Sequence, residues 1–438
     1  MSRIGAAILA RGVQSVGTRV DPPYNRRCSS PRWIAFVTTI TASNRPLASI
    51  RVLEMGALIA GPFCAKILAE FGADVVKIEP PRTGDALRAW RYVENGTSLW
   101  WHVQSRNKRS VAVDLRKPEG QAIARALALR ADILVENFRP GTLEAWNLSY
   151  ESLAAENPGL VMVRVSGYGQ TGPYRERPGF GVIGEAVGGL RYVTGTPDSP
   201  PSRVGVSIGD TLSALYGVIG AMMALEARLK NGRGQMVDVA LYEAVFSVME
   251  SMLPEFDRFD VVRERTGSIL PGIAPTSAYR CADGSFVLIA ANGDSIFQRL
   301  CRAMGRDDLA TDASLARNDG RAARQQWLDG EIEQWTSQRA PDDIVAAMQA
   351  ADVPASKIYT IRDIVADAQY AAREMIREIE LGDGSHLAVP GVVPKLSATP
   401  GGFHGGGPRL GEHTDDVLRD LGYDVATIAD LRAKGIVG

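Results

Sequence analysis

The stretch VLEMGALIAGPFCAKILAEFGADVVKIEPP, from Val52 to Pro81, contains the pattern that decides the fold. A short β-branched run over Ile50–Glu54 is followed by a helical stretch over Phe63–Phe71 and by a second β-branched run over Asp74–Glu79. Strand, helix and strand in this order predict two parallel strands joined by a crossover helix.

The same alternation continues along the first half of the chain and predicts an α/β fold. Further strands are predicted over Ser110–Asp114, Asp132–Glu136, Leu160–Ser166 and Gln235–Ala240, and a helix over Glu119–Arg130. Short apolar strands buried on both faces and joined by right-handed crossovers leave their loops at the carboxyl ends of the strands. We therefore expect any ligand to bind at that edge of the sheet.

A second unit is predicted to begin near Gly267. The run TSAYRCADGSFVLIAA indicates two strands around the turn Ala282-Asp283-Gly284, and helical patterns follow it. We divide the chain into an extension (1–48), the first part of a large domain (49–250), a linker with a small domain (251–352) and a linker with a C-terminal part (353–438).

The first 48 residues differ in composition from the rest of the chain. They contain seven arginines and a single acid, Asp21, without convincing periodicity. This composition is typical of a transit peptide, and an upstream stretch added by an early start codon explains it equally well. A transit peptide would direct the protein to a mitochondrion, whereas a bacterial protein without one would be cytoplasmic. No catalytic role is expected here under either interpretation.

Composition excludes several classes of protein. A formal net charge of −1 over 438 residues makes nucleic acid an unexpected partner. Four scattered cysteines without CxxC spacing argue against structural zinc or a disulfide framework, and four histidines form no metal motif, so no metal is expected. The longest apolar run, around Ala214 to Leu225, is predicted to be too short to cross a bilayer.

One carboxylate occupies a distinctive place in the run GVSIGDTLSALYGVIGAMMAL, from Gly205 to Leu225. Asp210 lies where a strand-like apolar run meets a long apolar helix. An isolated acid there can act as a nucleophile. It can equally be the N-cap of the helix, because Asp before Thr-Leu-Ser-Ala-Leu is a good cap and the helix dipole favours its charge.

The loop GYGQTG, Gly167 to Gly172, satisfies the GxGxxG pattern of dinucleotide-binding proteins. That fingerprint must open a helix, whereas Pro173 and Pro178 follow here and remove helix donors. We therefore predict a flexible loop at the carboxyl end of a strand and no NAD or FAD site.

Taken together, the motifs resemble the family III coenzyme A transferases, which include formyl-CoA:oxalate and carnitine CoA-transferases and the α-methylacyl-CoA racemases. The segments that carry the resemblance run from about Ile50 to the C-terminus: Val52–Pro81, RNKRSVAVDLRKPEG (106–120), DILVENFRPGTLEAWNL (132–148), SGYGQTGP (166–173), Gly205–Leu225, NGRGQMVDVALYEAV (231–245) and LGEHTDDVL (410–418).

The resemblance implies a Rossmann-like large domain built from both ends of the chain, a smaller α+β domain and an interlocked homodimer. It also implies CoA transfer between carboxylic acids through aspartyl anhydride and aspartyl-CoA thioester intermediates, with Asp210 as the nucleophile. The implied partners are an acyl-CoA and a small carboxylic acid, with coenzyme A as substrate and no tightly bound cofactor, nucleic acid or membrane.

Eleven positions match family residues that contact CoA: Ala60, Val113, Asp114, Leu115, Arg116, Asn137, Phe138, Arg139, Arg177, Gly179 and Phe180. Backbone amides and arginines suit the phosphates of CoA. Asp114 can alternatively cap the helix near Pro118, and Phe138 can belong to the core. A basic residue of the family is replaced by Pro80, which leaves Arg82 as a displaced substitute, and another family arginine falls on Ala145.

Departures from the family pattern narrow the activity. Racemases have a catalytic aspartate where this chain has Gly181, and formyl-CoA:oxalate enzymes have a glutamine where it has Ile59. The sequence pattern around TGSILPGIAPTSAY is similar to that of family members that transfer CoA from succinyl-CoA to dicarboxylates. Transfer from succinyl-CoA to a dicarboxylate is therefore the favoured hypothesis. A formyl-CoA:oxalate transferase and an acyl-CoA racemase or epimerase are the alternatives.

Two hypotheses lie outside the family's transfer chemistry. A binding or scaffold protein would have lost Asp210, which is present. A ligase would need GxxxxGK[ST], which does not occur. A hydrolase would need a nucleophile and a base such as Ser-His, and the GxSxG match at Gly205–Gly209 has no histidine near it in the sequence.

Overall fold

The computed structural model describes residues 45–438. Of the predicted extension, residues 1–44 lie outside the described part. Leu47 is buried, and its N–H donates to the Phe71 carbonyl at 3.0 Å. The chain is therefore part of the folded core from Leu47 onward.

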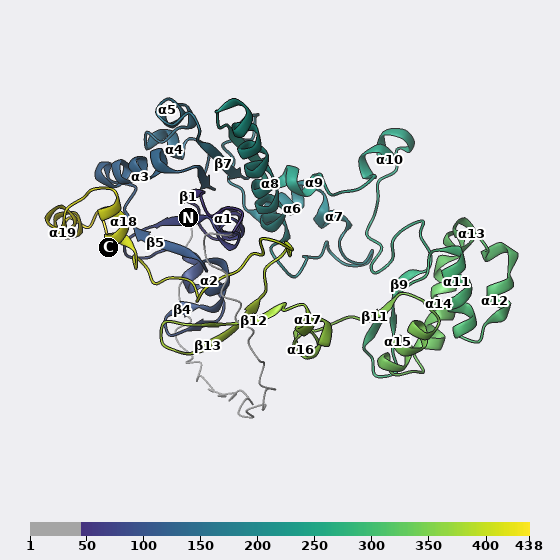
Figure 1. Cartoon of the computed structure of the whole chain (residues 1–438). Helices are drawn as coiled ribbons and strands as arrows, with labels where there is room; N and C mark the ends of the chain where they lie inside the picture. The colour runs from purple at the N-terminus through teal and green to yellow at the C-terminus, as the bar shows by residue number, and fades with distance from the viewer. Residues whose placement is uncertain (1–44) are drawn as a thin grey trace, which may run out of the picture. The chain divides into compact units, whose positions relative to one another are not determined.

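A six-stranded parallel sheet forms the centre of the mixed α/β fold (Figure 1). Its strands are β1 (Arg51–Glu54), β2 (Asp74–Glu79), β5 (Lys108–Ala112), β6 (Ile133–Glu136), β7 (Val161–Ser166) and β8 (Met236–Ala240). All pairs are parallel, in the order β5-β2-β1-β6-β7-β8. The strand order reverses between β1 and β6, and such a switch point opens a crevice at the carboxyl ends of the strands.

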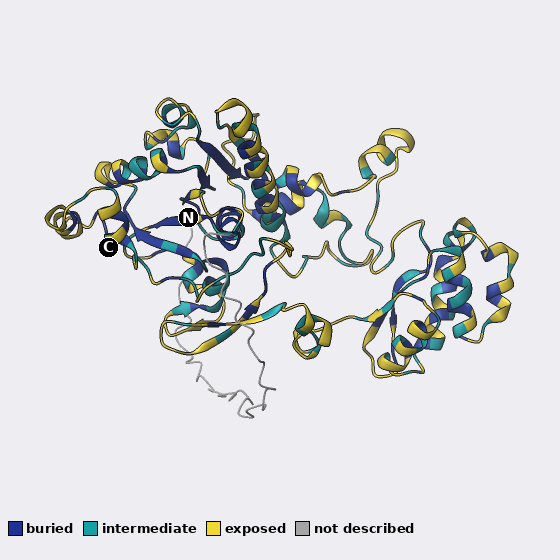
Figure 2. Cartoon of the chain, viewed as in Figure 1, coloured by how far each residue is buried: buried dark blue, intermediate teal, exposed yellow. Residues whose placement is uncertain are grey.

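Two apolar layers cover the two faces of this sheet. Successive side chains of β7 point to opposite faces of the sheet: Val161, Val163 and Val165 belong to one core cluster, and Met162 belongs to the other. The first cluster includes side chains of α1 (Ala60–Glu70) and α8 (Ile208–Asn231). The second includes side chains of α3 (Pro118–Arg130), α18 (Thr414–Asp420) and α19 (Val425–Ala433). Figure 2 shows the inner strands of the sheet, such as β7, as buried.

The strands predicted for the sheet are confirmed with small shifts at their ends. The largest shift concerns the predicted strand Ser110–Asp114, because β5 begins at Lys108 and ends at Ala112. Beyond β5, Val113 pairs with Val437 in an isolated bridge, and the N–H of Gly438 donates to Ala112 at 3.1 Å. The last residues of the chain thus extend the β5 edge.

Short elements lie between the strands of the sheet or follow β8, its last strand in the sequence. They are the 3₁₀ turn η2 (Ala86–Ala89), the hairpin β3 (Val93–Glu94) and β4 (Thr97–Ser98), α2 (Leu99–Gln104), α4 (Thr142–Ala145), α5 (Tyr150–Ala154), α6 (Gly181–Val187), α7 (Leu190–Val193), α9 (Leu241–Phe246) and α10 (Met252–Phe259).

A separate antiparallel sheet has its own core. It contains β9 (Thr276–Arg280), β10 (Phe286–Ala290) and β11 (Ala355–Lys357), so the hairpin predicted around Ala282-Asp283-Gly284 is confirmed. The accompanying helices are α11 (Asp294–Ala303), α12 (Asp307–Thr311), α13 (Asn318–Ala323), α14 (Gln325–Thr336) and α15 (Pro341–Ala350). The chain continues through α16 (Ile361–Ala366), α17 (Ala368–Ala372) and a hairpin of β12 (Ile376–Glu380) and β13 (His386–Pro390).

The apolar run around Ala214 to Leu225 lies within the long helix that was predicted after Gly205. Helix α8 has 24 residues and is long and apolar enough to cross a membrane, by length and composition alone. Its buried face packs against α1, β7 and β8, as in the core helix of an α/β fold.

Candidate active site

Asp210 lies in the first turn of α8, at the carboxyl edge of the sheet. The N-cap residue is Ser207, so the prediction that Asp210 caps the helix is wrong; it is the third helical residue. Burial, and to a lesser extent the nearby Glu185 carboxylate, raise the pKa of Asp210 to about 6, whereas Arg203 opposes the shift. Among the described residues no donor hydrogen-bonds this carboxylate. A desolvated carboxylate without partners is more reactive than a solvated one.

Gly181, the first residue of α6, lies directly against this carboxylate. A Cβ atom added at Gly181 would lie 2.1 Å from Oδ2 and 2.5 Å from Cγ of Asp210. The position where racemases have their aspartate therefore has no room for any side chain while Asp210 keeps its place.

Replacing Gly181 by alanine is expected to lower kcat/KM for CoA transfer by about 100-fold, because the Asp210 carboxylate must move to avoid the new methyl group. The matched control is Gly205→Ala, since a Cβ there meets no atom within 4 Å. Steady-state kinetics and thermal unfolding midpoints of both variants check the prediction. A Gly181→Ala enzyme with the activity of the control would contradict it.

A cavity of about 580 Å³ opens around Asp210. Seven of the eleven residues predicted to bind CoA line it: Ala60, Asn137, Phe138, Arg139, Arg177, Gly179 and Phe180. A second cavity of about 420 Å³ is lined by Phe138 as well, together with the other four: Val113, Asp114, Leu115 and Arg116. Because Ala57 and Phe138 line both, the two cavities adjoin at the switch point between β1 and β6. Their ligands remain predictions.

The turn between β1 and α1 forms the shared wall of the cavities. Leu58 has a φ of +66°, a left-handed conformation that non-glycine residues rarely adopt. Its N–H donates to Asp85 at 3.0 Å, and the Asn137 side chain accepts from Ala57 N–H at 2.8 Å and donates to Ala57 O at 2.9 Å. The Asn137 amide thus holds the turn, and Asp85 fixes the unusual backbone of Leu58.

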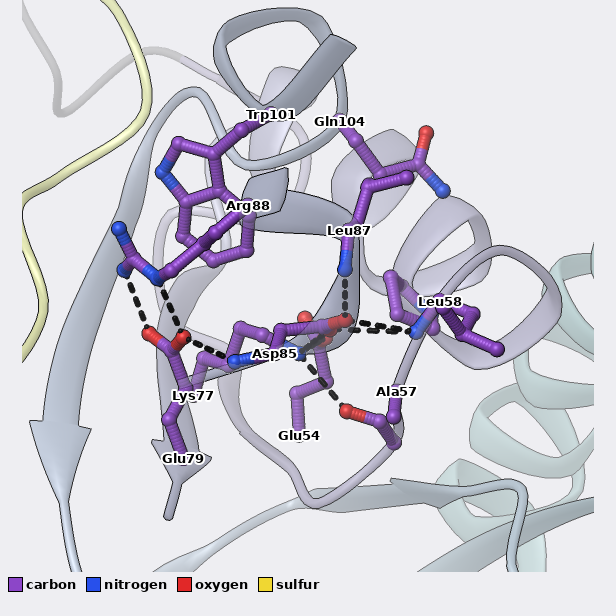
Figure 3. A network of polar contacts seen from close by, with 12 residues as sticks. Glu54, Ala57, Leu58, Lys77, Glu79, Asp85, Leu87, Arg88, Trp101 and Gln104 are labelled. Carbon is purple, nitrogen blue, oxygen red and sulfur yellow. Dashed lines mark hydrogen bonds and ion pairs between the residues drawn. The ribbon is translucent and has the colours of Figure 1, made fainter. Parts of the chain in front are cut away.

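A buried ionic network supports this turn from beneath (Figure 3). Lys77 contacts Glu54 at 2.7 Å and Asp85 at 2.9 Å, and donates to the Gly56 carbonyl at 2.7 Å. Lys108 contacts the second oxygen of Glu54 at 2.7 Å. Burial alone would lower the pKa of Lys77, but the surrounding carboxylates outweigh it and leave that pKa raised.

Arg88 extends the network toward the wall of the second cavity. It contacts the buried Glu79 through two bonds of 2.7 and 2.8 Å, and its guanidinium lies 3.7 Å from the Trp101 ring centroid. The Ser110 hydroxyl also donates to Glu79, at 2.6 Å. These bonds outweigh the effect of burial and lower the pKa of Glu79. Lys77 and Glu79, which line the second cavity, are thereby held in place.

Asp114 and Arg116 form a pair at the mouth of the second cavity. The guanidinium of Arg116 donates to both oxygens of Asp114 at 2.8 Å, and this lowers the pKa of Asp114 to about 2. The prediction that Asp114 caps the following helix is wrong: the N-cap is Lys117, and Asp114 binds the N–H of Arg116 instead. Arg82, the displaced substitute, lines the same cavity.

Residues 137–139 follow a buried acid at the end of β6. Glu136 accepts the Phe138 N–H at 2.7 Å and pairs with Arg164 at 2.7 Å, while burial raises the pKa of Glu136 to about 7. Phe138 is half-buried and meets Trp146 edge-on at 5.3 Å, so it belongs to the rim of the core and to both cavities. Arg139 is exposed beside it.

The GYGQTG segment forms a loop after β7 and opens no helix, as predicted. Gly167 and Gly179 close its neck, because a Cβ on either would lie within 3 Å of the other's Cα atom. The Gln170 N–H donates to Asp238 at 2.9 Å, and the Arg177 guanidinium lies 3.5 Å from the Tyr174 ring centroid. Side chains at the glycines would force the neck apart and move Arg177 and Phe180.

Several lining residues escaped the sequence analysis. Lys77, Asp85, Glu185 and Arg203 reach the cavities or Asp210 from segments far apart in sequence. Their only sequence signal is position, since Lys77 comes near the end of a predicted strand and Arg203 shortly before the long helix.

Comparison with known proteins identifies the family to which this chain belongs. The profile of "CoA-transferase family III" matches residues 47–414. This chain belongs to CoA-transferase family III. It is therefore a transferase that acts on CoA thioesters.

Two relatives and one solved structure show how much of the chain the family fold covers. The chain is 49% identical over 395 residues to the succinyl-CoA–D-citramalate CoA-transferase of Chloroflexus aurantiacus, covering 90% of this chain and 98% of that protein. It is 42% identical over 402 residues to the succinyl-CoA–L-malate CoA-transferase beta subunit of the same organism, covering 91% and 99%. A CaiB/BaiF family protein of Brucella suis has a TM-score of 0.77 at 33% identity, covering 86% of this chain and all of the other.

Proposed function

We propose that this enzyme transfers CoA from succinyl-CoA to a dicarboxylic acid, with Asp210 as the nucleophile. The observation that carries the proposal is a partly desolvated Asp210 carboxylate, to which no residue in the described part of the chain donates a hydrogen bond, in a cavity that adjoins a second one large enough to continue an extended ligand. The two curated relatives that use succinyl-CoA with citramalate and malate support the choice of donor and of acceptor class.

Four displacements account for the transfer. The Asp210 carboxylate attacks the thioester carbonyl, forming a C–O bond while the C–S bond breaks and CoA thiolate leaves. The thiolate then attacks the Asp210 carbonyl of the anhydride, so that succinate leaves and an aspartyl-CoA thioester remains. The acceptor carboxylate then attacks the aspartyl carbonyl of this thioester and displaces CoA thiolate, which leaves a second anhydride. Attack of the thiolate on the acceptor carbonyl of that anhydride releases the Asp210 carboxylate and the new acyl-CoA.

Each intermediate keeps the free energy of the original thioester only if water is excluded. The Asp210 carboxylate is half-buried in its cavity and is covered on one side by Gly181. The CoA moiety is proposed to extend past Phe138 into the second cavity, where Arg116 and Arg82 offer cations to phosphate groups. Arg139 and Arg177 offer the same in the first cavity.

A racemase or an oxalate-specific transferase receives less support. Gly181 offers no base at the racemase position, and Ile59 is a buried apolar residue whose carbonyl accepts from Gln104 at 2.9 Å. Neither position supplies the polar group that those activities use.

Purified protein incubated with succinyl-CoA and one free acid at a time tests the proposal. The panel contains citramalate, malate, glutarate, itaconate, oxalate and carnitine, and mass spectrometry follows each new acyl-CoA. We expect new thioesters with one or more of the larger dicarboxylates and none with carnitine. Transfer to oxalate alone, or to no acid at all, would contradict the proposed function.

We also propose the homodimer and the large and small domains that the family resemblance implies. Support comes from apolar side chains exposed in the single chain on α8 and α10: Leu215, Ile219, Met222, Met223, Leu253, Phe256 and Phe259. Such a set is typical of a surface covered by another subunit. Light scattering is expected to give the mass of two chains, and the mass of one chain would contradict the dimer.

A further inference from the structure

Arg203 is a cation of the Asp210 cavity to which the family resemblance assigned no role. It lines the cavity with Ser207 and Asp210, in the segment that leads into α8. Its guanidinium donates to the Ser207 hydroxyl at 3.4 Å, which is a weak bond. Among the described residues it contacts no carboxylate, whereas Arg175 pairs with Glu176 at 3.3 Å and Arg191 with Glu185 at 3.2 Å.

Position separates Arg203 from the other two arginines of the cavity. Arg139 follows Phe138, which borders the second cavity, and Arg177 stacks on Tyr174 in the loop after β7. Arg203 lies where α8 begins, because its guanidinium reaches Ser207, the N-cap residue of the helix that carries Asp210. All three residues line the same cavity, and the positive charge of Arg203 opposes the rise in the pKa of Asp210. Arg203 is therefore placed on the Asp210 side of the cavity.

A dicarboxylic substrate presents a specific electrostatic demand there. One carboxylate reacts at Asp210, and the other brings a second negative charge into the same cavity as the Asp210 carboxylate. Two negative charges in one partly desolvated cavity repel each other strongly unless a cation neutralises one of them. A guanidinium forms two parallel hydrogen bonds to a carboxylate, and the N-terminus of α8 adds its positive dipole end.

We propose that Arg203 binds the non-reacting carboxylate of the succinyl group and of the acceptor acid, and so makes the enzyme specific for dicarboxylates. This inference rests on the proposed function, because it names the group that selects its substrates. Donor and acceptor acids occupy the site in turn, so one arginine serves both half-reactions.

Kinetics with matched thioesters test the role of Arg203. Succinyl-CoA and butyryl-CoA differ by one terminal carboxylate, so the ratio of their kcat/KM values isolates recognition of that group. In Arg203→Ala this ratio is expected to fall about 10- to 100-fold, with a similar rise in KM for citramalate. Arg203→Lys is expected to retain part of the wild-type preference for succinyl-CoA. The control variant Arg175→Ala is expected to keep the full preference.

Binding of free acids gives a second readout that does not require turnover. Calorimetry is expected to show that Arg203→Ala binds succinate about 10- to 100-fold more weakly than wild type, with binding of butyrate unchanged. Equal losses for succinyl-CoA and butyryl-CoA would overturn the inference, since Arg203 would then serve the CoA moiety. Unchanged succinate binding would overturn it as well.

The two proposals fail in different ways. Absence of transfer by the wild-type enzyme contradicts the proposed function, whereas the difference between wild type and Arg203→Ala in succinate binding decides the role of Arg203. Arg203 is exposed and makes one weak side-chain bond, so the variant is expected to keep the wild-type unfolding midpoint.

Discussion

Replacing Asp210 by asparagine is expected to lower CoA transfer by about 10⁴- to 10⁶-fold, because the amide keeps the shape of the side chain but cannot form the anhydride. Mass spectrometry of wild-type protein with succinyl-CoA is expected to detect CoA bound to the protein at Asp210, and the variant is expected to carry none.

The matched control for this variant is Asp238→Asn. Desolvation also raises the pKa of Asp238, which lies in the middle of β8 and lines neither cavity. Its bond from the Gln170 N–H needs only an acceptor oxygen, which asparagine retains. An Asp210→Asn enzyme as active as this control would exclude the anhydride mechanism.

The same carboxylate makes activity and stability depend on pH in opposite directions. The nucleophile must be ionised, so wild-type kcat/KM is expected to rise with pH through about 6. Because the folded-state pKa lies above the ordinary value of 3.8, the folded protein retains a proton that the unfolded chain has lost between about pH 4 and pH 6. The free energy of unfolding that Asp210 contributes therefore falls as pH rises through this window.

Asp210→Asn removes this effect and is expected to stabilise the protein by about 1–3 kcal/mol at pH 7.5, with little gain at pH 4. Unfolding midpoints of wild type and variant at the two pH values check the sign. A variant that is less stable than wild type at pH 7.5 would show that the carboxylate contributes to folding.

Replacing Lys77 by methionine is expected to lower the free energy of unfolding by about 3–5 kcal/mol. Methionine has a similar length but no charge, so the buried carboxylates of Glu54 and Asp85 lose the cation between them. Glu54 keeps Lys108, whereas Asp85 has no other cation among its described contacts. The uncompensated burial of Asp85 is therefore the main cause of the loss.

Urea unfolding of Lys77→Met and of the control Lys434→Met measures this effect. Lys434 forms an exposed pair with Asp430 at 2.6 Å, and its loss is expected to change stability by less than about 0.5 kcal/mol. If Lys77→Met proves insoluble, Asp85→Asn tests the same network with a smaller expected loss. Equal stability of the Lys77 and Lys434 variants would show that the network contributes little.

The local sequence pattern was sufficient to predict the strands of the parallel sheet and the edge of that sheet at which the cavities lie. The runs at Asp74–Glu79 and Leu160–Ser166 became β2 and β7 because apolar β-branched residues fit a strand buried on both faces. The capping roles considered for Asp210 and Asp114 were wrong, because local sequence does not fix the residue at which a helix begins. A helix can begin at any of several neighbouring residues, and the sequence signal for its first turn does not fix which one.

By itself the sequence determined the order of strands and helices, the family and the candidate nucleophile, because these depend on residue type and on spacing along the chain. Only the tertiary structure decided that Gly181 touches Asp210, that Asp85 holds Leu58, and that Arg203 lines the same cavity as Asp210. These contacts join segments that the sheet brings together, and their distances follow from side-chain packing that no local pattern encodes.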